Sequence, residues 1–215
     1  MAEVAAYLTP EVLEAPSVRR DETDSVHIFS TTPGVRIEYQ VTDATGKSLT
    51  NGWTLYTAPF HLAENHATIR ARVSAATNSD HPEVAPRLGY APSLIQTPAL
   101  NDDDRKALLD GNGYTTVTLE DGQSSIELFL EQPQPISKLI YTPSQQRDAS
   151  GHIRSYSLYL DGKKVVSGHF DNIRNNPIAQ EILLPAGAVG SRLRLVADAL
   201  VDGAKQITLG GLSIE

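Results

Sequence analysis

Hydrophobic and polar positions alternate in short runs along most of the chain. Before residue 92 these runs include SVHIFS, VRIEYQV, WTLYTAPF and TIRARVSA, which are rich in β-branched and aromatic residues and bounded by Gly, Pro, Asn or Asp. In VRIEYQV every second residue from Val35 is apolar or aromatic, and Ile69, Ala71 and Val73 repeat this period. A period of two is typical of strands with one buried face. Residues 17–91 are therefore predicted to form a small antiparallel β-sandwich.

A second series of short runs occupies the rest of the chain, at a spacing of roughly ten residues. The runs are YTTVTL, SSIELFL, SKLIYTP, SYSLYL, KKVVSGHF, AQEILL, SRLRLVAD and QITLGGLSIE. This spacing predicts a second β-sandwich or jelly roll over residues 104–215.

Two segments lie outside these two units, and a short helix is expected where the second unit begins. Residues 1–16 are expected to be an N-terminal extension with room for a short helix, limited by its prolines. Residues 92–103 are expected to be a linker that also supplies the first strand of the second unit. In NDDDRKALLDGNG one helical turn is expected, with Asn101 or Asp102 as its cap.

One segment, SYSLYLDGKKVVSGHF, is predicted to be a β-hairpin. Tyr156 and Leu160 share one face of its first strand, and Asp161-Gly162 is a strong turn signal because a type I′ turn needs positive φ at both central residues. Gly168 is interpreted as a β-bulge in the return strand.

Composition narrows the classes of function. The chain has 215 residues and a net charge of -8, and its Lys and Arg residues do not cluster, which argues against nucleic acids and membrane insertion as partners. The absence of cysteine excludes disulfides and Cys-type zinc sites. The start of the sequence does not read as a secretory signal. We expect a fragment of a secreted protein with an added initiator Met, a full-length cytosolic protein being the alternative.

Several pieces of the second unit occur in a recognisable order. LLDGNGYTT is followed by YTP, GHIRSY, DG and GHF, and then by SRLRLVAD. This order resembles the discoidin family, the factor V/VIII C-type domains, which includes family 32 carbohydrate-binding modules. The resemblance covers residues 104–215 and implies a discoidin-like jelly roll.

The first unit carries a resemblance of its own. Its pattern resembles the chitobiase/hexosaminidase C-terminal type of Ig-like module, also described as fibronectin-III-associated. The matching residues are Gly34, Ile37, Tyr39, Tyr56, Pro59, Phe60, Ile69 and Ala71. Trp53 is expected to pack beside the Tyr-Pro turn, in the core or between domains, rather than to form a sugar platform.

The two resemblances together imply an all-β protein of two β-sandwiches, Ig-like then discoidin-like. This pair is similar to the C-terminal tail of secreted bacterial glycoside hydrolases, with family 29 α-L-fucosidases the nearest case. The implied location is extracellular, periplasmic or at the bacterial cell surface.

Catalytic motifs are not found in the sequence. It contains no HExxH, no Gly-x-Ser-x-Gly and no P-loop. Glycosidases need two carboxylates across a cleft, whereas Glu127, Glu131 and the run 102–104 are expected to be solvated. The chain is therefore not expected to be an enzyme by itself, although it is expected to be part of a glycoside hydrolase.

Sugar binding needs planar polar side chains beside an apolar or aromatic surface. In discoidin-like modules this site lies on loops at one end of the sandwich. By this resemblance the candidate ligand-binding residues are Tyr114, Arg147, Asp148, His152, His169, Asn172, Arg174 and Asn175. Galactose-binding members carry Arg after Tyr-x-Pro and Asn before Gly-x-Ile, where this chain has Ser144 and Ser150; Arg147 is a substitute from the same loop. The alternative for every candidate is an ordinary polar surface loop.

A structural Ca²⁺ is the metal that the resemblance implies. Asp110 and Thr115 match its first ligands, and oxygen ligands suit Ca²⁺. A glycine of LGGLSIE stands where the family has a Glu, and the alternative for Asp110 is a turn residue before Gly111. No cofactor is expected to be required.

The sequence predicts a non-catalytic, carbohydrate-binding accessory module of a secreted bacterial carbohydrate-active enzyme. Its expected partners are a glycan and the catalytic domain of the parent enzyme. Two alternatives stay open: a structural spacer and docking module for a glycosidase catalytic domain, and a protein or cell-surface adhesion module.

Overall fold

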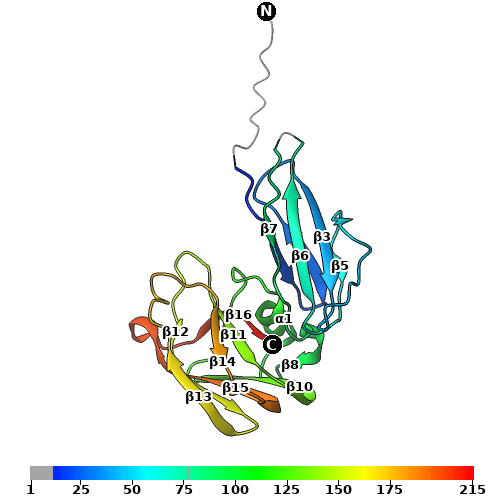
Figure 1. Ribbon diagram of the computed structural model, residues 1–215. Coiled ribbons are helices and arrows are strands. Elements are labelled where there is room, and N and C mark those ends of the chain that lie inside the picture. The colour runs from blue at the N-terminus through cyan, green and yellow to red at the C-terminus, as the bar shows by residue number, and fades with distance from the viewer. Residues whose placement is uncertain (1–11, 77) are drawn as a thin grey trace, which may run out of the picture.

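Antiparallel sheets make up most of the computed structural model, which describes residues 12–76 and 78–215. The all-β prediction is confirmed. Figure 1 shows the strands in two groups, an N-terminal part in blue and cyan that stands on a C-terminal part in green to red. The short helix expected near the start of the chain falls mostly outside the described residues.

The N-terminal part contains a three-stranded sheet, ordered β1-β2-β5, and a four-stranded sheet, ordered β4-β3-β6-β7. Its strands are β1 (Ser17–Arg20), β2 (Ser25–Phe29), β3 (Arg36–Thr42), β4 (Thr54–Leu55), β5 (Phe60–His61), β6 (Thr68–Ser74) and β7 (Glu83–Val84). Ile69 and Ala71 of β6 are fully buried in a core with Val26 and Val41, as the period-two pattern predicts.

One expected strand is interrupted. WTLYTAPF forms two short strands, β4 and β5, which belong to different sheets. Between them lies Pro59, which has no N–H to donate to a ladder, so the chain changes sheet at this corner.

The environment of Trp53 differs from the prediction. The guanidinium carbon of Arg72 lies 4.0 Å from the centre of the Trp53 ring, and that of Arg70 lies 5.3 Å away. These arginines alternate with the buried residues of β6 and therefore face outward. Trp53 belongs to neither core, so the expectation of core packing is wrong, while the alternative of inter-domain packing stays a prediction. The reason is that two arginine side chains cover the ring on the outer face.

The C-terminal part also contains two antiparallel sheets. A five-stranded sheet has the order β13-β12-β15-β10-β8, and a four-stranded sheet has the order β14-β11-β16-β9. Their strands are β8 (Ile95–Gln96), β9 (Val117–Thr118), β10 (Ser125–Pro135), β11 (Lys138–Pro143), β12 (Ile153–Leu160), β13 (Lys163–His169), β14 (Gln180–Leu183), β15 (Val189–Leu200) and β16 (Thr208–Ile214). Alternate residues of β10 and β15, among them Leu128 and Leu193, fill the core between these sheets.

The predicted hairpin is formed by β12 and β13. Asp161 and Gly162 both have positive φ, 49° and 83°, as the turn prediction requires. Gly168 is not a bulge, because it pairs in register with Tyr156 and the register shift lies nearer the turn. A Cβ at Gly168 would lie 2.8 Å from the Tyr156 hydroxyl oxygen, so the glycine makes room for this ring.

The segment 92–103 is part of the C-terminal fold. It includes a 3₁₀ turn, η1 (Pro92–Leu94), then β8, which pairs with β10, and then the start of helix α1 (Asp102–Leu109). The helix has eight residues rather than the single turn expected. Asn101 is its N-cap, since its side chain accepts a hydrogen bond from the Asp104 N–H. The helix is extended because Leu108 and Leu109 are buried in the core. No helix in the described part of the chain has the length and hydrophobicity to cross a membrane.

The two parts meet at a junction near Arg20. This buried side chain donates hydrogen bonds to the carbonyls of Leu62, Glu64 and Gly89, at 3.2, 2.8 and 2.7 Å. Burial lowers the pKa of Arg20, and the nearby carboxylates of Asp24 and Glu64 oppose that shift.

Four long-range hydrogen bonds among the described residues cross this junction, one of them from the Tyr90 hydroxyl to the Pro135 carbonyl at 2.5 Å. Arg19 Nη1 donates to the Asp110 carbonyl at 3.0 Å, and Asp24 Oδ1 accepts from the Ser93 N–H at 3.1 Å. The Tyr90 N–H donates to the Ile214 carbonyl at 2.7 Å. In Figure 1 the C-terminus lies beside α1, where the two parts meet.

Candidate functional site

Loops at one end of the C-terminal sandwich are held together by Gln145. Its N–H donates to the Gly113 carbonyl at 2.7 Å, and its side-chain amide donates to the Pro143 carbonyl at 3.0 Å and to the Pro177 carbonyl. These contacts join the loop after α1, the loop after β11 and the loop before β14. Most of the predicted site residues lie on these loops.

A cleft lies beside these loops and has a rigid floor. The carbonyls of Gly151 and His152 accept hydrogen bonds from the N–H groups of Thr208 and Val201, at 3.1 and 2.9 Å. Gly151 has a φ of +83°, and a Cβ there would lie 2.3 Å from the Gln206 carbonyl oxygen. Only glycine fits this backbone without strain. The loop after β11 is thus fixed against the β15–β16 connection.

The cleft has a volume of about 670 Å³ and a mostly polar lining. Arg174 reaches across it, with its Nε 3.1 Å from Asp202 Oδ2. The lining residues are Thr118, Ala149, Ser150, Gly151, His152, Arg174, Val201, Asp202, Ala204, Lys205, Gln206 and Thr208. Two of the predicted ligand residues, His152 and Arg174, therefore line one cleft.

His152 is the buried polar group of this cleft. Its side chain is 7% exposed, and its Nε2 has no hydrogen-bond partner within the described residues. Burial lowers the pKa of His152, while a hydrogen bond to the Ser144 backbone opposes the shift. A neutral imidazole has one donor and one acceptor nitrogen, and a sugar hydroxyl can pair with Nε2 in either role.

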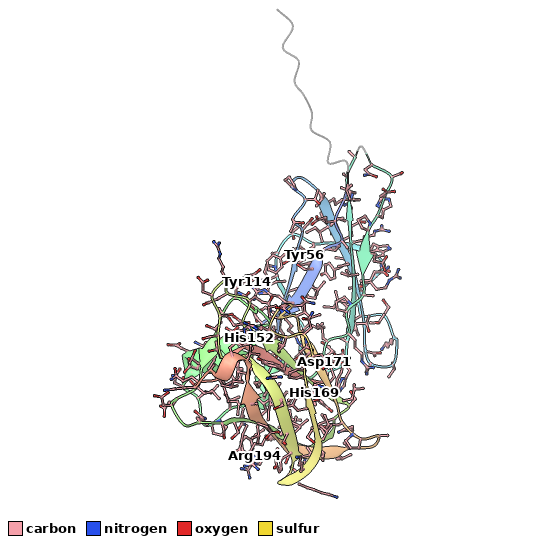
Figure 2. All side chains as sticks on the ribbon, turned by 90° about the vertical axis from the view of Figure 1, so that its left-hand side faces the viewer. Tyr56, Tyr114, His152, His169, Asp171 and Arg194 are labelled. Carbon is pink, nitrogen blue, oxygen red and sulfur yellow. The ribbon has the colours of Figure 1, made fainter. Side chains whose placement is uncertain are left out.

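The remaining candidates on the loops after α1 and after β11 are exposed. Tyr114 has 68% of its surface exposed, and its carbonyl accepts a hydrogen bond from the Gln146 side chain at 3.1 Å. Arg147 and Asp148 are exposed on the adjoining turn and are not among the cleft-lining residues. In the view of Figure 2, Tyr114 and His152 lie in the upper half of the C-terminal part, and Arg194 lies at its base.

The candidates between β13 and β14 form a separate group, apart from Arg174. His169 Nε2 lies 2.9 Å from Asp171 Oδ1, and both side chains are largely exposed. Asn175 Nδ2 donates to Asn172 Oδ1 at 3.2 Å. Neither His169 nor these asparagines line the cleft.

Sequence reasoning missed the third wall of the cleft. Asp202, Lys205 and Gln206 lie in the connection between β15 and β16, which contains η2 (Val201–Gly203). Asp202 has a φ of +54°, a conformation that Asp tolerates better than most residues. The Asp-Gly pair at 202–203, between two expected strands, was the available signal for a polar turn at this place.

The two residues expected to bind Ca²⁺ are in contact with each other. Thr115 Oγ1 donates to Asp110 Oδ2 at 2.5 Å, and the Asn112 N–H donates to Asp110 Oδ1 at 2.7 Å. The Arg19 guanidinium donates a hydrogen bond to the Asp110 carbonyl. Both carboxylate oxygens are therefore used within the loop, and the described residues contain no group of three or more acidic or His ligands. These contacts do not test the calcium expectation, and calcium binding stays a prediction.

The sequence matches no protein-family model and no curated protein. Among solved structures, a family 32 carbohydrate-binding module of a family 31 glycoside hydrolase from Clostridium perfringens has 17% identity and a TM-score of 0.48. The match covers 57% of this chain and 90% of that chain. A family 32 module from the same organism, in complex with GalNAc-β-1,3-galactose, has 21% identity and a TM-score of 0.45 over 56% of this chain and 92% of that chain.

A third solved structure covers almost the whole chain. It is a SusE-like protein with 13% identity and a TM-score of 0.46, and the match covers 93% of this chain and 95% of that chain. At these identities and TM-scores neither a fold nor a ligand is transferred from these proteins to the present chain.

Proposed function

We propose that the chain is a non-catalytic, carbohydrate-binding accessory module and that the cleft beside Gly151 and His152 holds the glycan. The observation that carries this proposal is the convergence of Arg174, Asp202 and Gln206 on one cleft next to an unpartnered, buried His152 Nε2. The family 32 resemblance of the surrounding segments supports it.

The lining suits sugar hydroxyls. Vicinal hydroxyls present a donor and an acceptor side by side, which a carboxylate and a guanidinium can bind together. Asp202 and Arg174 are such a pair, and Gln206 can both donate and accept. The lining contains no Tyr, Trp or Phe among the described residues, so polar contacts rather than ring stacking would supply the affinity. Weak binding by an isolated site is expected.

The wider setting belongs to the same proposal. The parent protein is a secreted bacterial glycoside hydrolase such as an α-L-fucosidase, located outside the cell, in the periplasm or at the cell surface. Its catalytic domain is the expected protein partner, and the N-terminal Ig-like module is the spacer. This setting rests on the order of the two resemblances.

A glycan array with the purified chain tests the proposal. Hits should be confirmed by calorimetry, and Arg174→Ala should weaken a confirmed hit roughly ten- to hundredfold, because a hydrogen bond to a charged group contributes about 1.5–3 kcal/mol. Arg154→Ala is the matched control, since Arg154 is exposed on β12 and does not line the cleft. A blank array with a folded protein, or equal losses in the two variants, would count against a glycan site in this cleft.

The docking alternative has an observation of its own. Leu183 lies on the edge strand β14 and is 65% exposed, and Ile178 just before this strand is 56% exposed. Exposed apolar side chains along a sheet edge are suited to contact with another protein surface. If the array is blank, sedimentation of the chain with the separately expressed catalytic domain is the next experiment, and Leu183→Glu should abolish a complex formed through this edge.

A further inference from the structure

The charge of the cleft is opposite to the charge of the chain. The chain has a net charge of -8, but the cleft lining contains two cations, Arg174 and Lys205, and one anion, Asp202. Arg174 and Asp202 pair with each other, and Lys205 has no acidic partner among the described residues. With His152 neutral, the lining carries one net positive charge.

The donors of this cleft remain available to a ligand. Asp202 engages Arg174 through Nε, and no further partner of the guanidinium is found in residues 12–76 and 78–215. The pair is exposed, with 69% and 61% of the two side chains accessible, so it contributes little to stability and can rearrange at low cost. A carboxylate could therefore be bound by the Arg174 terminal nitrogens and the Lys205 ammonium together.

At the floor of the cleft, His152 requires a hydroxyl rather than an anionic group. His152 Nε2 has no hydrogen-bond partner among the described residues, and leaving a buried polar atom unsatisfied has a free-energy cost that a ligand hydroxyl, which can donate or accept, would remove. A ligand that fills the cleft should thus present an anionic group to Lys205 and a hydroxyl to His152. A sugar acid carries both groups on one ring.

We infer that the glycan recognised by this cleft is an acidic one, in which a uronic acid residue places its carboxylate between Lys205 and Arg174 and a ring hydroxyl against His152 Nε2. This inference rests on the proposed function and goes beyond it by naming the sugar class. A neutral sugar can give His152 Nε2 a hydroxyl partner, but it offers no anionic group to Lys205.

The test compares trigalacturonate with its fully methyl-esterified form, by calorimetry on the whole chain at low salt. The two probes share every hydroxyl and differ in their charge and in the methyl groups of the ester. The acid should bind at least about tenfold more tightly than the ester, because charge-assisted hydrogen bonds are roughly twice as strong as neutral ones. Lys205→Ala should abolish that preference.

Lys163→Ala is the matched control. Lys163 is exposed and lies next to the hairpin turn, where it pairs with Leu160, the last residue of β12. His152 lies just before the first residue of β12, at the other end of the strand. An equal loss in the two lysine variants would mean general attraction of a polyanion and would overturn the inference.

Asp202→Asn adds a test of opposite sign. Removing this negative charge should tighten binding of the acid. Binding of the ester should be unchanged or weaker. Equal or tighter binding of the ester by the native chain would overturn the acidic-sugar inference while leaving the glycan site in place. Failure of both probes, together with a blank array, would remove the proposed function itself.

Discussion

At the scale of single residues, the cleft depends on a position with no side chain. Gly151 combines positive φ with close approach to the Gln206 carbonyl, and its own carbonyl anchors the β15–β16 connection through Thr208. A methyl group here meets backbone atoms, which cannot move aside as the end of a long side chain can. The shape of the cleft is therefore sensitive to a very small change.

We expect Gly151→Ala to lower the free energy of unfolding by about 1–3 kcal/mol from backbone strain alone, with more from the overlap, and to abolish glycan binding. Urea unfolding and calorimetry measure the two effects. Gly122→Ala is the control, because Gly122 also has positive φ, at 82°, but nothing lies within 4 Å of its Cβ position. If Gly151→Ala bound glycan normally, the rigid floor would not be needed for the site.

At the scale of elements, helix α1 is determined by both its ends and its buried side. Asn101 caps it, with its Oδ1 2.9 Å from the Asp104 nitrogen and its Nδ2 2.7 Å from Asp104 Oδ2. Three acidic residues in the first turn complement the helix dipole, and Leu108 is completely buried.

Asn101→Ala should reduce the free energy of unfolding by about 1 kcal/mol, the usual effect of losing an N-cap. Thermal or urea denaturation measures this change. Asn101→Ser, which keeps a capping oxygen, should stay within a few tenths of a kcal/mol of the native protein. A loss as large in the serine variant would show that the cap does not carry the effect.

The elements also show what could be predicted from the sequence. Long alternating runs such as β6, β10 and β12 were predicted correctly, because burial of one face imposes a period of two. WTLYTAPF was not, since a corner between two sheets breaks the run while its composition stays strand-like. The length of the helix was underestimated because it depends on leucines that pack on β16. The local sequence pattern gives no sign of this tertiary contact.

The candidate site was predicted less completely than the strands. His152 and Arg174 were found because the family resemblance implies a binding site on the loops that carry them. Asp202 and Lys205 were missed because they reach the cleft through a turn with positive φ and a tertiary contact, and neither produces a periodic signal. Composition of a loop indicated polar groups, but only the fold could bring three loops to one place.

At the scale of the whole molecule, the two parts are in close contact at the junction. Arg20 binds three carbonyls of the N-terminal part, and its own carbonyl oxygen is 3.0 Å from the Cβ position of Gly111 in the C-terminal part. Gly89 is equally constrained, because a Cβ there would lie 1.9 Å from the Ile214 carbonyl oxygen. Little hinge motion is expected at so close a contact.

Arg20→Met should lower stability by about 3–5 kcal/mol, since it leaves buried carbonyls and the Asp24 carboxylate without their cation. We expect the native protein to unfold in one transition and this variant to unfold in two. The sole tryptophan, Trp53, reports on the N-terminal part by fluorescence, and far-ultraviolet circular dichroism reports on both parts. Arg154→Met is the exposed control. Coincident transitions in Arg20→Met would show that the arginine does not couple the two parts.

The same junction has a consequence for the order of folding. The hydrogen bond from Tyr90 to Ile214 joins the end of the N-terminal part to the last strand of the C-terminal part, and β16, which carries Ile214, must first pair with β9 and β11. Contacts between distant segments form slowly, because the loop entropy is lost before the contact is gained. The surface on which the N-terminal part stands therefore exists only after the last strand has been inserted, and the attachment of the two parts is a late event in the life of each new chain.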